Sequence, residues 1–282
     1  MADVKTSVSN TAKSTSKSTS KSTSSKGSNT MMMNLIIVVI CIAIAHLIFH
    51  LVFSTQFLDA EKHKAKNLMG TMYQGGWVVP ILISTMLVMI SFVIERAATI
   101  FKSRGKIGNA EFIKKVQFHL SSKNIDAAMS ECDKQAGSVG NVMKAGLKTY
   151  KDMASNTTLD TEQKLASIKK EVEETTSLEL PMMEKNLVFL ATITSAATLL
   201  GLFGTVMGMI RAFAAMANAG APDANALAAG ISEALVNTAL GIGTSFIAML
   251  AYNFFTTIID NVTYGIDESG FTLEQSFKAN FK

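Results

Sequence analysis

Cysteine, proline and charged residues are all scarce in this sequence of 282 residues. It holds only 3 prolines and 2 cysteines, and charged residues make up 17% of it against 48% hydrophobic residues. Cys41 lies in an apolar stretch and Cys132 in a polar one, so both are expected as free thiols. The four histidines form no metal-ligand pattern on a shared soluble element, and no cofactor is predicted. These shortages favour a polytopic helical membrane protein over a soluble domain of similar length.

Two long apolar segments dominate the second half of the chain. Residues 187–210 contain no charged residue, and residues 226–259 contain a single one, Glu233. About 20 apolar residues suffice to cross a bilayer as a helix, and backbone groups in lipid must be hydrogen-bonded internally. Both segments are therefore predicted to be transmembrane helices. The second would be roughly 51 Å long, well beyond the ~30 Å hydrocarbon core, so it is expected to project into the cytoplasm.

Two further apolar runs precede these segments. Residues 31–53 carry no formal charge, which predicts a retained span and not a cleaved signal peptide. The next run begins at Trp77, a residue typical of a membrane interface, and ends at Glu95 and Arg96. Those two charged residues are expected either to contact partner helices or to lie on a solvated helix end.

The distribution of Lys and Arg sets the predicted topology. Basic residues are abundant in 102–186 and absent from 218–226, so the positive-inside rule places both termini in the cytoplasm. Residues 1–30, with a Lys every four residues among Ser and Thr, are typical of a disordered tail. The predicted segments are a disordered basic cytoplasmic tail (1–30), an extra N-terminal transmembrane helix (31–54), a periplasmic loop (55–76), a transmembrane helix (77–101), a cytoplasmic helical domain (102–186), a transmembrane helix (187–217), a periplasmic loop (218–226), a transmembrane helix (227–260) and a cytoplasmic tail (261–282).

Two groups of residues could be mistaken for metal sites. His46 and His50 lie four residues apart on one face of the first span, a spacing that suits a metal ion or a proton relay. With no third ligand nearby, polar contacts near the outer end of the helix are the favoured interpretation. The acidic residues between 171 and 179 are interpreted as a solvated helix face.

Small and hydroxyl residues recur on one face of each of the last two spans, at helical spacing. In the third span these are Thr194, Thr198, Gly201, Thr205 and Gly208. In the fourth span one face holds Gly230, Glu233, Asn237, Gly241, Thr244 and Ala248, and the adjoining face holds Thr238, Gly241 and Ser245. Gly204 and Gly208 form the small-xxx-small pattern of helix contacts. Two interpretations stay open: helix packing, with threonines bonded to their own backbone, or a polar path for ions.

Glu233 favours the second interpretation. A carboxylate inside a span costs roughly 2.5–3.5 kcal/mol on insertion scales, so it should face protein or water. A position near the outer interface is the alternative. A channel-facing carboxylate with hydroxyls at Thr205 and Thr238 would hold water and bias cation passage.

The residues of the last two spans resemble the MotA/TolQ/ExbB proton-channel family, and ExbB most of all. The segments that carry this resemblance are Leu200-Gly-Leu-Phe-Gly-Thr-Val-Met-Gly-Met-Ile-Arg-Ala-Phe213, Gly230-Ile-Ser-Glu-Ala-Leu-Val-Asn-Thr-Ala-Leu-Gly-Ile-Gly243 and Ala251-Tyr-Asn-Phe254. It is specific over 187–260 and extends to about residue 75. The first span lies outside the family's common three-span core. Many relatives have a proline where this chain has Thr198, so the helix is expected to be straighter here.

The resemblance implies an inner-membrane homopentamer around a central pore. The pore would hold the single span of an ExbD-like partner, and the proton motive force would act through a TonB-like protein on outer-membrane transport. It assigns Thr205 and Thr238 to the pore and makes Glu233 the span carboxylate, while the proton-carrying aspartate belongs to the partner. Phospholipid contact is implied, and nucleic acid is not.

Other functions remain possible before the structure is considered. Within the family, these are a TolQ-like role in envelope maintenance and a MotA-like stator. Outside it, a structural membrane scaffold is viable. A secondary transporter is disfavoured because the sequence shows no internal repeat. A membrane enzyme is disfavoured because no nucleophile–base pair or metal cluster is recognisable.

Overall fold

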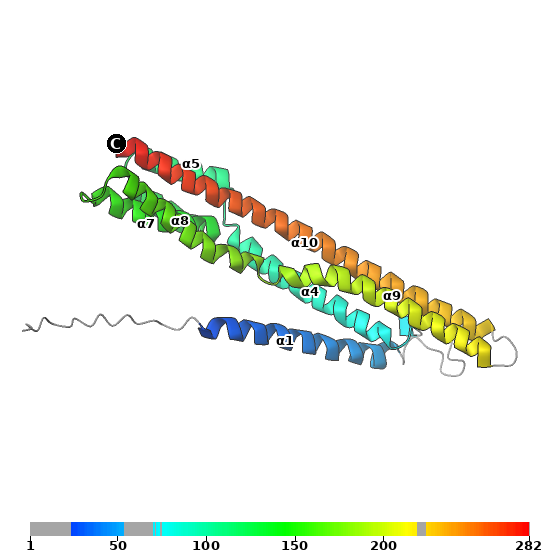
Figure 1. Ribbon diagram of the computed structural model, residues 1–282. Helices are drawn as coiled ribbons and strands as arrows, with labels where there is room; N and C mark the ends of the chain where they lie inside the picture. Colours follow the sequence, from blue (N-terminus) through cyan, green and yellow to red (C-terminus); the bar gives the residue numbers. More distant parts are fainter. Residues whose placement is uncertain (1–23, 54–69, 71, 74, 219–223, 282) are drawn as a thin grey trace, which may run out of the picture.

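The computed structural model describes residues 24–53, 70, 72–73, 75–218 and 224–281, and every long element in that part of the chain is a helix (Figure 1). In chain order these are α1 (Ser24–Leu47), the π-helix η1 (Ile48–Phe53), α4 (Val78–Ser103), α5 (Asn109–Ser121), α6 (Ile125–Gln135), α7 (Gly137–Ser155), α8 (Thr161–Glu184), α9 (Leu187–Asn218) and α10 (Ala224–Asn280). Four stretches are long and apolar enough to cross a membrane: residues 32–51, 78–103, part of 161–217 and part of 224–280. The predicted class, an all-α polytopic membrane protein, is confirmed.

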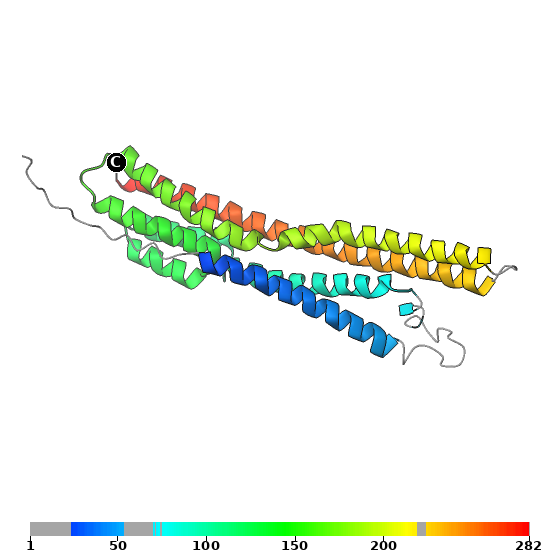
Figure 2. The same cartoon turned by 60° about the horizontal axis from the view of Figure 1, so that its bottom comes forward.

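The long helices lie side by side and alternate in direction. α9 and α10 run antiparallel along the apolar end of the molecule, α4 packs against both, and α1 lies against α4 (Figures 1 and 2). A small apolar cluster joins α1 and η1 to α4: Ala45, Phe49, Val79 and Ile83. α1 thus lies at the edge of the bundle, next to α4.

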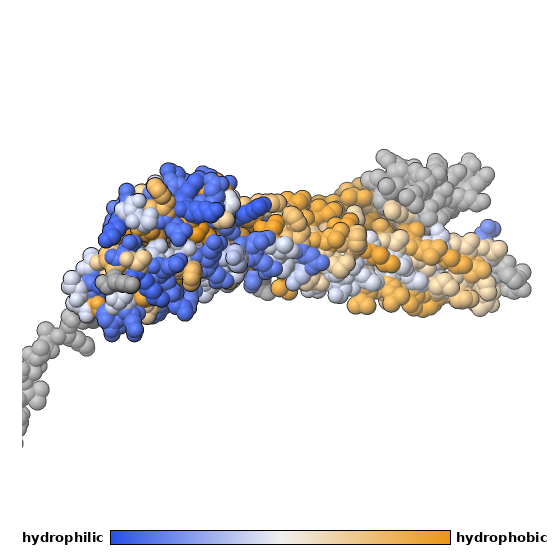
Figure 3. All heavy atoms as spheres, turned by 90° about the horizontal axis from the view of Figure 1, so that it is seen from above, coloured by the Kyte–Doolittle hydropathy of each residue, from blue (hydrophilic) through white to orange (hydrophobic). Residues whose placement is uncertain are grey.

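The polar end of the molecule consists of α5 to α8 and the last part of α10. Figure 3 shows hydrophilic side chains gathered over this end and hydrophobic ones over the span region. Its core is aromatic and aliphatic: Tyr150 and Phe277 are fully buried, with ring centroids 4.9 Å apart. α8 begins with a capping box, in which the Asp160 side chain accepts from the Gln163 N–H at 2.7 Å.

α10 is one helix of 57 residues, about 86 Å long. It includes most of the segment predicted as a cytoplasmic tail (261–282). That segment is helical because buried residues at helical spacing, among them Val262, Ile266 and Leu273, join the core of the polar end.

The chain breaks between α8 and α9, and not at Pro181, which lies inside α8. Lys185 ends α8, and Asn186 adopts a left-handed backbone conformation with φ of 65°. Asparagine tolerates this conformation better than most residues. α9 then runs unbroken past Thr198.

Several predictions concern residues outside the described part of the chain. These are the greater part of the tail 1–30, most of the loop 55–76 and the centre of the loop 218–226. α1 begins at Ser24, several residues before the apolar run. Cys41 and Cys132 are both buried free thiols.

Candidate functional site

The seam between α9 and α10 is built from glycine. A Cβ atom at Gly208 would lie 2.8 Å from the backbone nitrogen of Ala234, and one at Gly241 would lie 2.6 Å from the carbonyl oxygen of Ala197. Gly201 would meet the Asn237 carbonyl oxygen at 3.0 Å. Glycine is required at these positions because the two backbones touch. The packing interpretation therefore holds for Gly201 and Gly208.

Thr205 and Thr238 meet across this seam. Their hydroxyl oxygens are hydrogen-bonded to each other, and each also lies 3.2 Å from a carbonyl of its own helix, that of Gly201 or Ala234. The pair holds two hydroxyl protons, so one hydroxyl donates to the other while the second donates to a carbonyl. Rotating both hydroxyls reverses the direction of the bond without moving a heavy atom.

Glu233 lies buried on α10 and pairs with Arg211 of α9. Arg211 Nη1 donates to Glu233 Oε1 at 2.7 Å, and the guanidinium is partly exposed. Both groups sit against Gly76, whose φ is 75°. A Cβ there would clash with the carboxylate and lie 2.7 Å from Arg211 Nη1. The pairing neutralises a carboxylate that would otherwise be costly to bury.

Asn237 occupies the position one turn after Glu233. It is fully buried, its Nδ2 donates to the Gly75 carbonyl at 3.1 Å, and a Cβ at Gly204 would press against it. Its Oδ1 has no hydrogen-bond partner among the described residues. Glu233 and Asn237 thus face the segment that leads into α4. Thr238 lies about 100° further round the helix from Asn237.

The small and hydroxyl residues that were predicted to share one face of each of the last two spans therefore have different surroundings in the structure. All six residues of the predicted α10 face, Gly230 to Ala248, are buried. Thr205 and Thr238 are brought together, whereas Glu233 pairs with a residue that the sequence analysis did not single out. Of the other threonines, Thr194 is bonded to its own helix, to the Leu190 carbonyl at 3.0 Å, and Thr198 is exposed.

One feature of the sequence could have marked Arg211 as part of the site. It is the only charged residue in α9, and an isolated cation that close to a span needs a partner. Glu233 is the only acidic residue in the apolar part of α10. The sequence is therefore compatible with an ion pair between these two isolated charges on adjacent helices, but it does not establish that they meet.

The remaining candidate residues lie away from the seam. His46 Nδ1 is 3.1 Å from the Ile42 carbonyl, and its ring centroid is 6.5 Å from that of His50. Across the described residues, no group of three His, Cys, Asp or Glu side chains is arranged to hold a metal. Glu95 and Arg96 contact each other and the α8–α9 junction of the same chain.

Fold and site together define a multi-pass membrane protein with hydroxyl and ionic pairs held inside its helix bundle. Residues 134–268 match the MotA/TolQ/ExbB proton channel family, which assigns this region of the chain to that family and confirms the resemblance.

The relatives carry two names. The chain is 31% identical over 135 residues to "Tol-Pal system protein TolQ" of Pseudomonas aeruginosa, which covers 45% of this chain and 58% of that protein. It is 41% identical over 75 residues to the protein of the same name from Haemophilus influenzae, covering 27% and 33%. It is 30% identical over 99 residues to "Biopolymer transport protein ExbB" of Xanthomonas campestris pv. campestris, covering 35% and 39%. Each match thus spans less than two thirds of the relative, and TolQ-like and ExbB-like roles are not separated.

Proposed function

We propose that this chain is an ExbB-like subunit of an inner-membrane, proton-driven motor. With an ExbD-like single-span partner it uses the proton motive force to energise TonB-dependent outer-membrane transport. The subunit forms a homopentamer around a central pore, with both termini in the cytoplasm. The observation that carries the proposal is the hydroxyl pair of Thr205 and Thr238 within the span region.

The hydroxyl pair has the chemistry of a proton relay. A hydroxyl can donate and accept at once, and reversing a chain of such bonds passes a proton without net movement of heavy atoms. In the proposal the partner's carboxylate carries the proton and this pair conducts it. One charge crossing the membrane releases about 2.3 kcal/mol per 100 mV, which can bias a rotation step.

Exposed apolar side chains on α9 and α10 support assembly around a shared axis. Leu199, Leu202, Leu235 and Ile242 are all more than half exposed in the single chain. Lipid, a second copy and a partner helix are the surroundings in which such faces are stable. In the proposal Glu233, fixed by Arg211, shapes the field beside the pathway.

The test replaces each hydroxyl by a methyl group. Thr205→Val and Thr238→Val, co-expressed with the adjacent single-span partner, are expected to reduce energy-dependent uptake about tenfold or more. Native mass spectrometry should show an unchanged assembly. Thr205→Ser retains the hydroxyl and should recover most of the uptake.

Thr192→Val is the matched control. Thr192 lies on the same helix, is exposed, and donates only to the Val188 carbonyl of its own helix at 2.8 Å. Uptake should be normal in this variant. Normal uptake in the Thr205 and Thr238 variants, with assembly intact, would favour a structural scaffold instead.

A TolQ-like function is the second candidate, because two of the relatives bear that name. The two roles differ in the partner and in the phenotype. An ExbB-like subunit should restore uptake in a strain that lacks it, and a TolQ-like subunit should restore resistance to detergent. A MotA-like stator would restore neither.

A further inference from the structure

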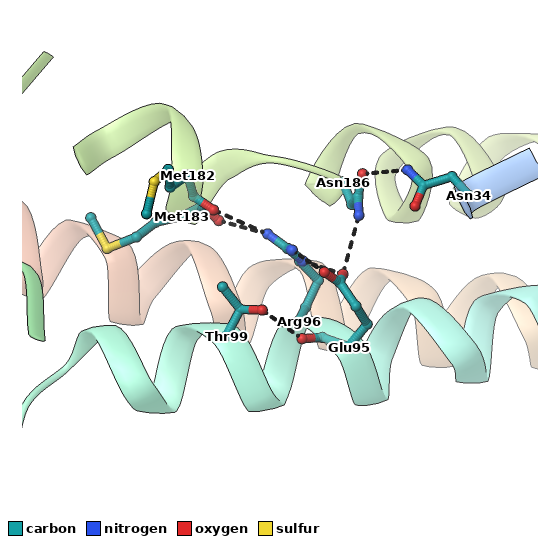
Figure 4. A network of polar contacts seen from close by, with 7 residues as sticks. All are labelled: Asn34, Glu95, Arg96, Thr99, Met182, Met183 and Asn186. Atoms are coloured by element: carbon teal, nitrogen blue, oxygen red, sulfur yellow. Dashed lines mark hydrogen bonds and ion pairs between the residues drawn. The ribbon is translucent and has the colours of Figure 1, made fainter. Parts of the chain in front are cut away.

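The junction between α8 and α9 contains backbone carbonyls that need donors from elsewhere. The last turn of α8 has no basic residue, and its carbonyls lie at the negative end of the helix dipole. Arg96 of α4 supplies the donors. Its Nη1 lies 3.3 Å from the Met183 carbonyl oxygen and 3.4 Å from that of Met182 (Figure 4). α4 thus caps the end of α8, at carbonyls that lie 86 and 87 residues after Arg96 in the sequence.

Arg96 is held in place by its neighbour. Its Nε donates to Glu95 Oε2 at 2.6 Å, and its Nη2 donates to the other carboxylate oxygen. Arg96 is almost completely buried, and this carboxylate together with the Met182 and Met183 carbonyls makes its burial tolerable.

The same carboxylate fixes the orientation of Asn186. A carboxylate can only accept, so the Asn186 amide must turn its Nδ2 toward Glu95, at 3.2 Å. Its Oδ1 then points away and can only accept. The donor it receives is Asn34 Nδ2 of α1, at 2.8 Å (Figure 4).

A chain of hydrogen bonds therefore runs from α1 to the junction, and its donors on both sides point toward the Glu95 carboxylate. Asn34 donates to Asn186, Asn186 donates to Glu95, and Glu95 holds the arginine that caps α8. Asn186 is the residue with the left-handed backbone, where the chain changes direction between the polar end and the span. Elsewhere α1 contacts α4, for example through Cys41 and Ser91, whose side-chain atoms are 3.5 Å apart.

We propose that α1 is a clamp on the α8–α9 junction, and that Asn34 is the positioning residue through which it acts. By holding Asn186 in its left-handed conformation, α1 fixes the angle at which α8 of the polar end meets the membrane helix that carries Thr205. This role is independent of what the assembly transports.

The experiment measures hydrogen exchange of the purified, assembled full-length protein by mass spectrometry, on peptides that cover 184–190. Two of its amides report directly on the junction: Lys185 N–H bonds to the Pro181 carbonyl at 3.1 Å, and Phe189 N–H to that of Asn186 at 3.1 Å. Asn34→Leu removes the donor, and Asn34→Asp keeps the shape but sets a carboxylate against an acceptor. Both should raise exchange in this segment about threefold to tenfold.

Cys41→Ala is the matched control, because it removes an α1–α4 contact without touching the junction. It should leave exchange at 184–190 within about twofold of the unmodified protein. Peptides from α5 and α6 should be unchanged in every variant.

A double-mutant cycle separates a clamp from general loosening. Asn186→Gly keeps the left-handed backbone but removes the side chain, so Asn34→Leu should have no further effect in that background. Unchanged exchange in both Asn34 variants would overturn the proposal. So would an equal additional increase in the Asn186→Gly background. Neither outcome bears on uptake by the Thr205 variants, so the two proposals fail separately.

Discussion

Within the described residues, two Arg–Glu pairs lie inside the helix bundle, and they are built in opposite ways. At the α9–α10 seam the carboxylate is hidden, with Glu233 7% exposed and Arg211 44% exposed. At the α8–α9 junction the cation is hidden, with Arg96 2% exposed and Glu95 37% exposed. The buried Glu233 carboxylate lies against Gly76, and the buried Arg96 guanidinium reaches the carbonyls at the end of α8.

The difference indicates what each pair does. A buried cation among carbonyls satisfies backbone groups, which is a structural task. The buried Glu233 carboxylate lies beside a positive-φ glycine and is bonded to Arg211 and to no backbone group within the described part of the chain, so it needs Arg211 to be tolerated. Losing the exposed partner should therefore destabilise the protein more at the Arg211–Glu233 pair than at the Arg96–Glu95 pair.

The largest expected effect comes from removing the exposed partner of each pair. Arg211→Met leaves a buried, uncompensated carboxylate and should lower the free energy of unfolding by about 3 kcal/mol or more. Glu95→Gln keeps an acceptor for Arg96 and should cost only about 1 kcal/mol. Denaturant titration in detergent micelles measures both.

A second substitution tests whether the unpaired Glu233 charge causes the loss of stability in Arg211→Met. Adding Glu233→Gln to Arg211→Met removes the stranded charge and should recover most of the lost stability. Equal losses from Arg211→Met and Glu95→Gln would contradict the comparison.

A smaller loss of stability is expected from a substitution at Gly76, which lies against the Arg211–Glu233 pair. Gly76→Ala places a Cβ against Glu233 and Arg211 on a left-handed backbone, and should cost about 1–3 kcal/mol. Gly243→Ala is the matched control, because nothing lies within 4 Å of the added atom. In the helical interior that change should be neutral or stabilising by up to about 1 kcal/mol. A Gly76→Ala protein as stable as the Gly243→Ala protein would remove the case for a tight fit under Glu233.

The smallest effect concerns the buried thiol of Cys132 in the polar end of the molecule. Burial, and to a lesser degree Asp133, raises the pKa of the Cys132 thiol from 9.0 to about 12. The thiol stays protonated in the folded state, so the stability it contributes is present below pH 9 and is lost as the pH rises toward 12. At pH 8, iodoacetamide should modify Cys132 only after unfolding, as peptide mass spectrometry can follow.

Cys132→Ala is the control for the pH dependence. Unfolding measured between pH 8 and 10 should lose stability more steeply in the unmodified protein than in this variant. Rapid alkylation of the folded protein at pH 8 would show that the thiol is accessible.

Sequence patterns predicted the parts of this molecule that depend on periodicity. The spans follow from apolar runs, and the glycine seam follows from small residues spaced every three or four positions, such as Gly201 and Gly208. Thr205 and Thr238 were also grouped correctly as members of one polar region. Periodicity tells which residues share a face of a helix.

It does not tell what that face meets. Glu233 was expected beside the hydroxyls, but Arg211, which the sequence presents as the charged flank of a span, holds it on the side toward Gly76. The contact between Asn34 and Asn186 joins residues 152 positions apart, and no local pattern marks it. The helix beyond Asp260 was missed because its apolar positions are separated by many polar ones.

The uninterrupted course of α10 has a mechanical consequence. Glu233 and Phe277 are fixed to the same rod, about 66 Å apart along its axis. α8 and α9, in contrast, are joined through two non-helical residues, Lys185 and Asn186. A twist applied to α10 near Glu233 is therefore passed toward Phe277 through continuous helix, whereas the parallel route through Asn186 depends on the side-chain hydrogen bonds that hold that junction. The two ends of the molecule are thus connected by one uninterrupted helix and by one junction whose stiffness α1 sets.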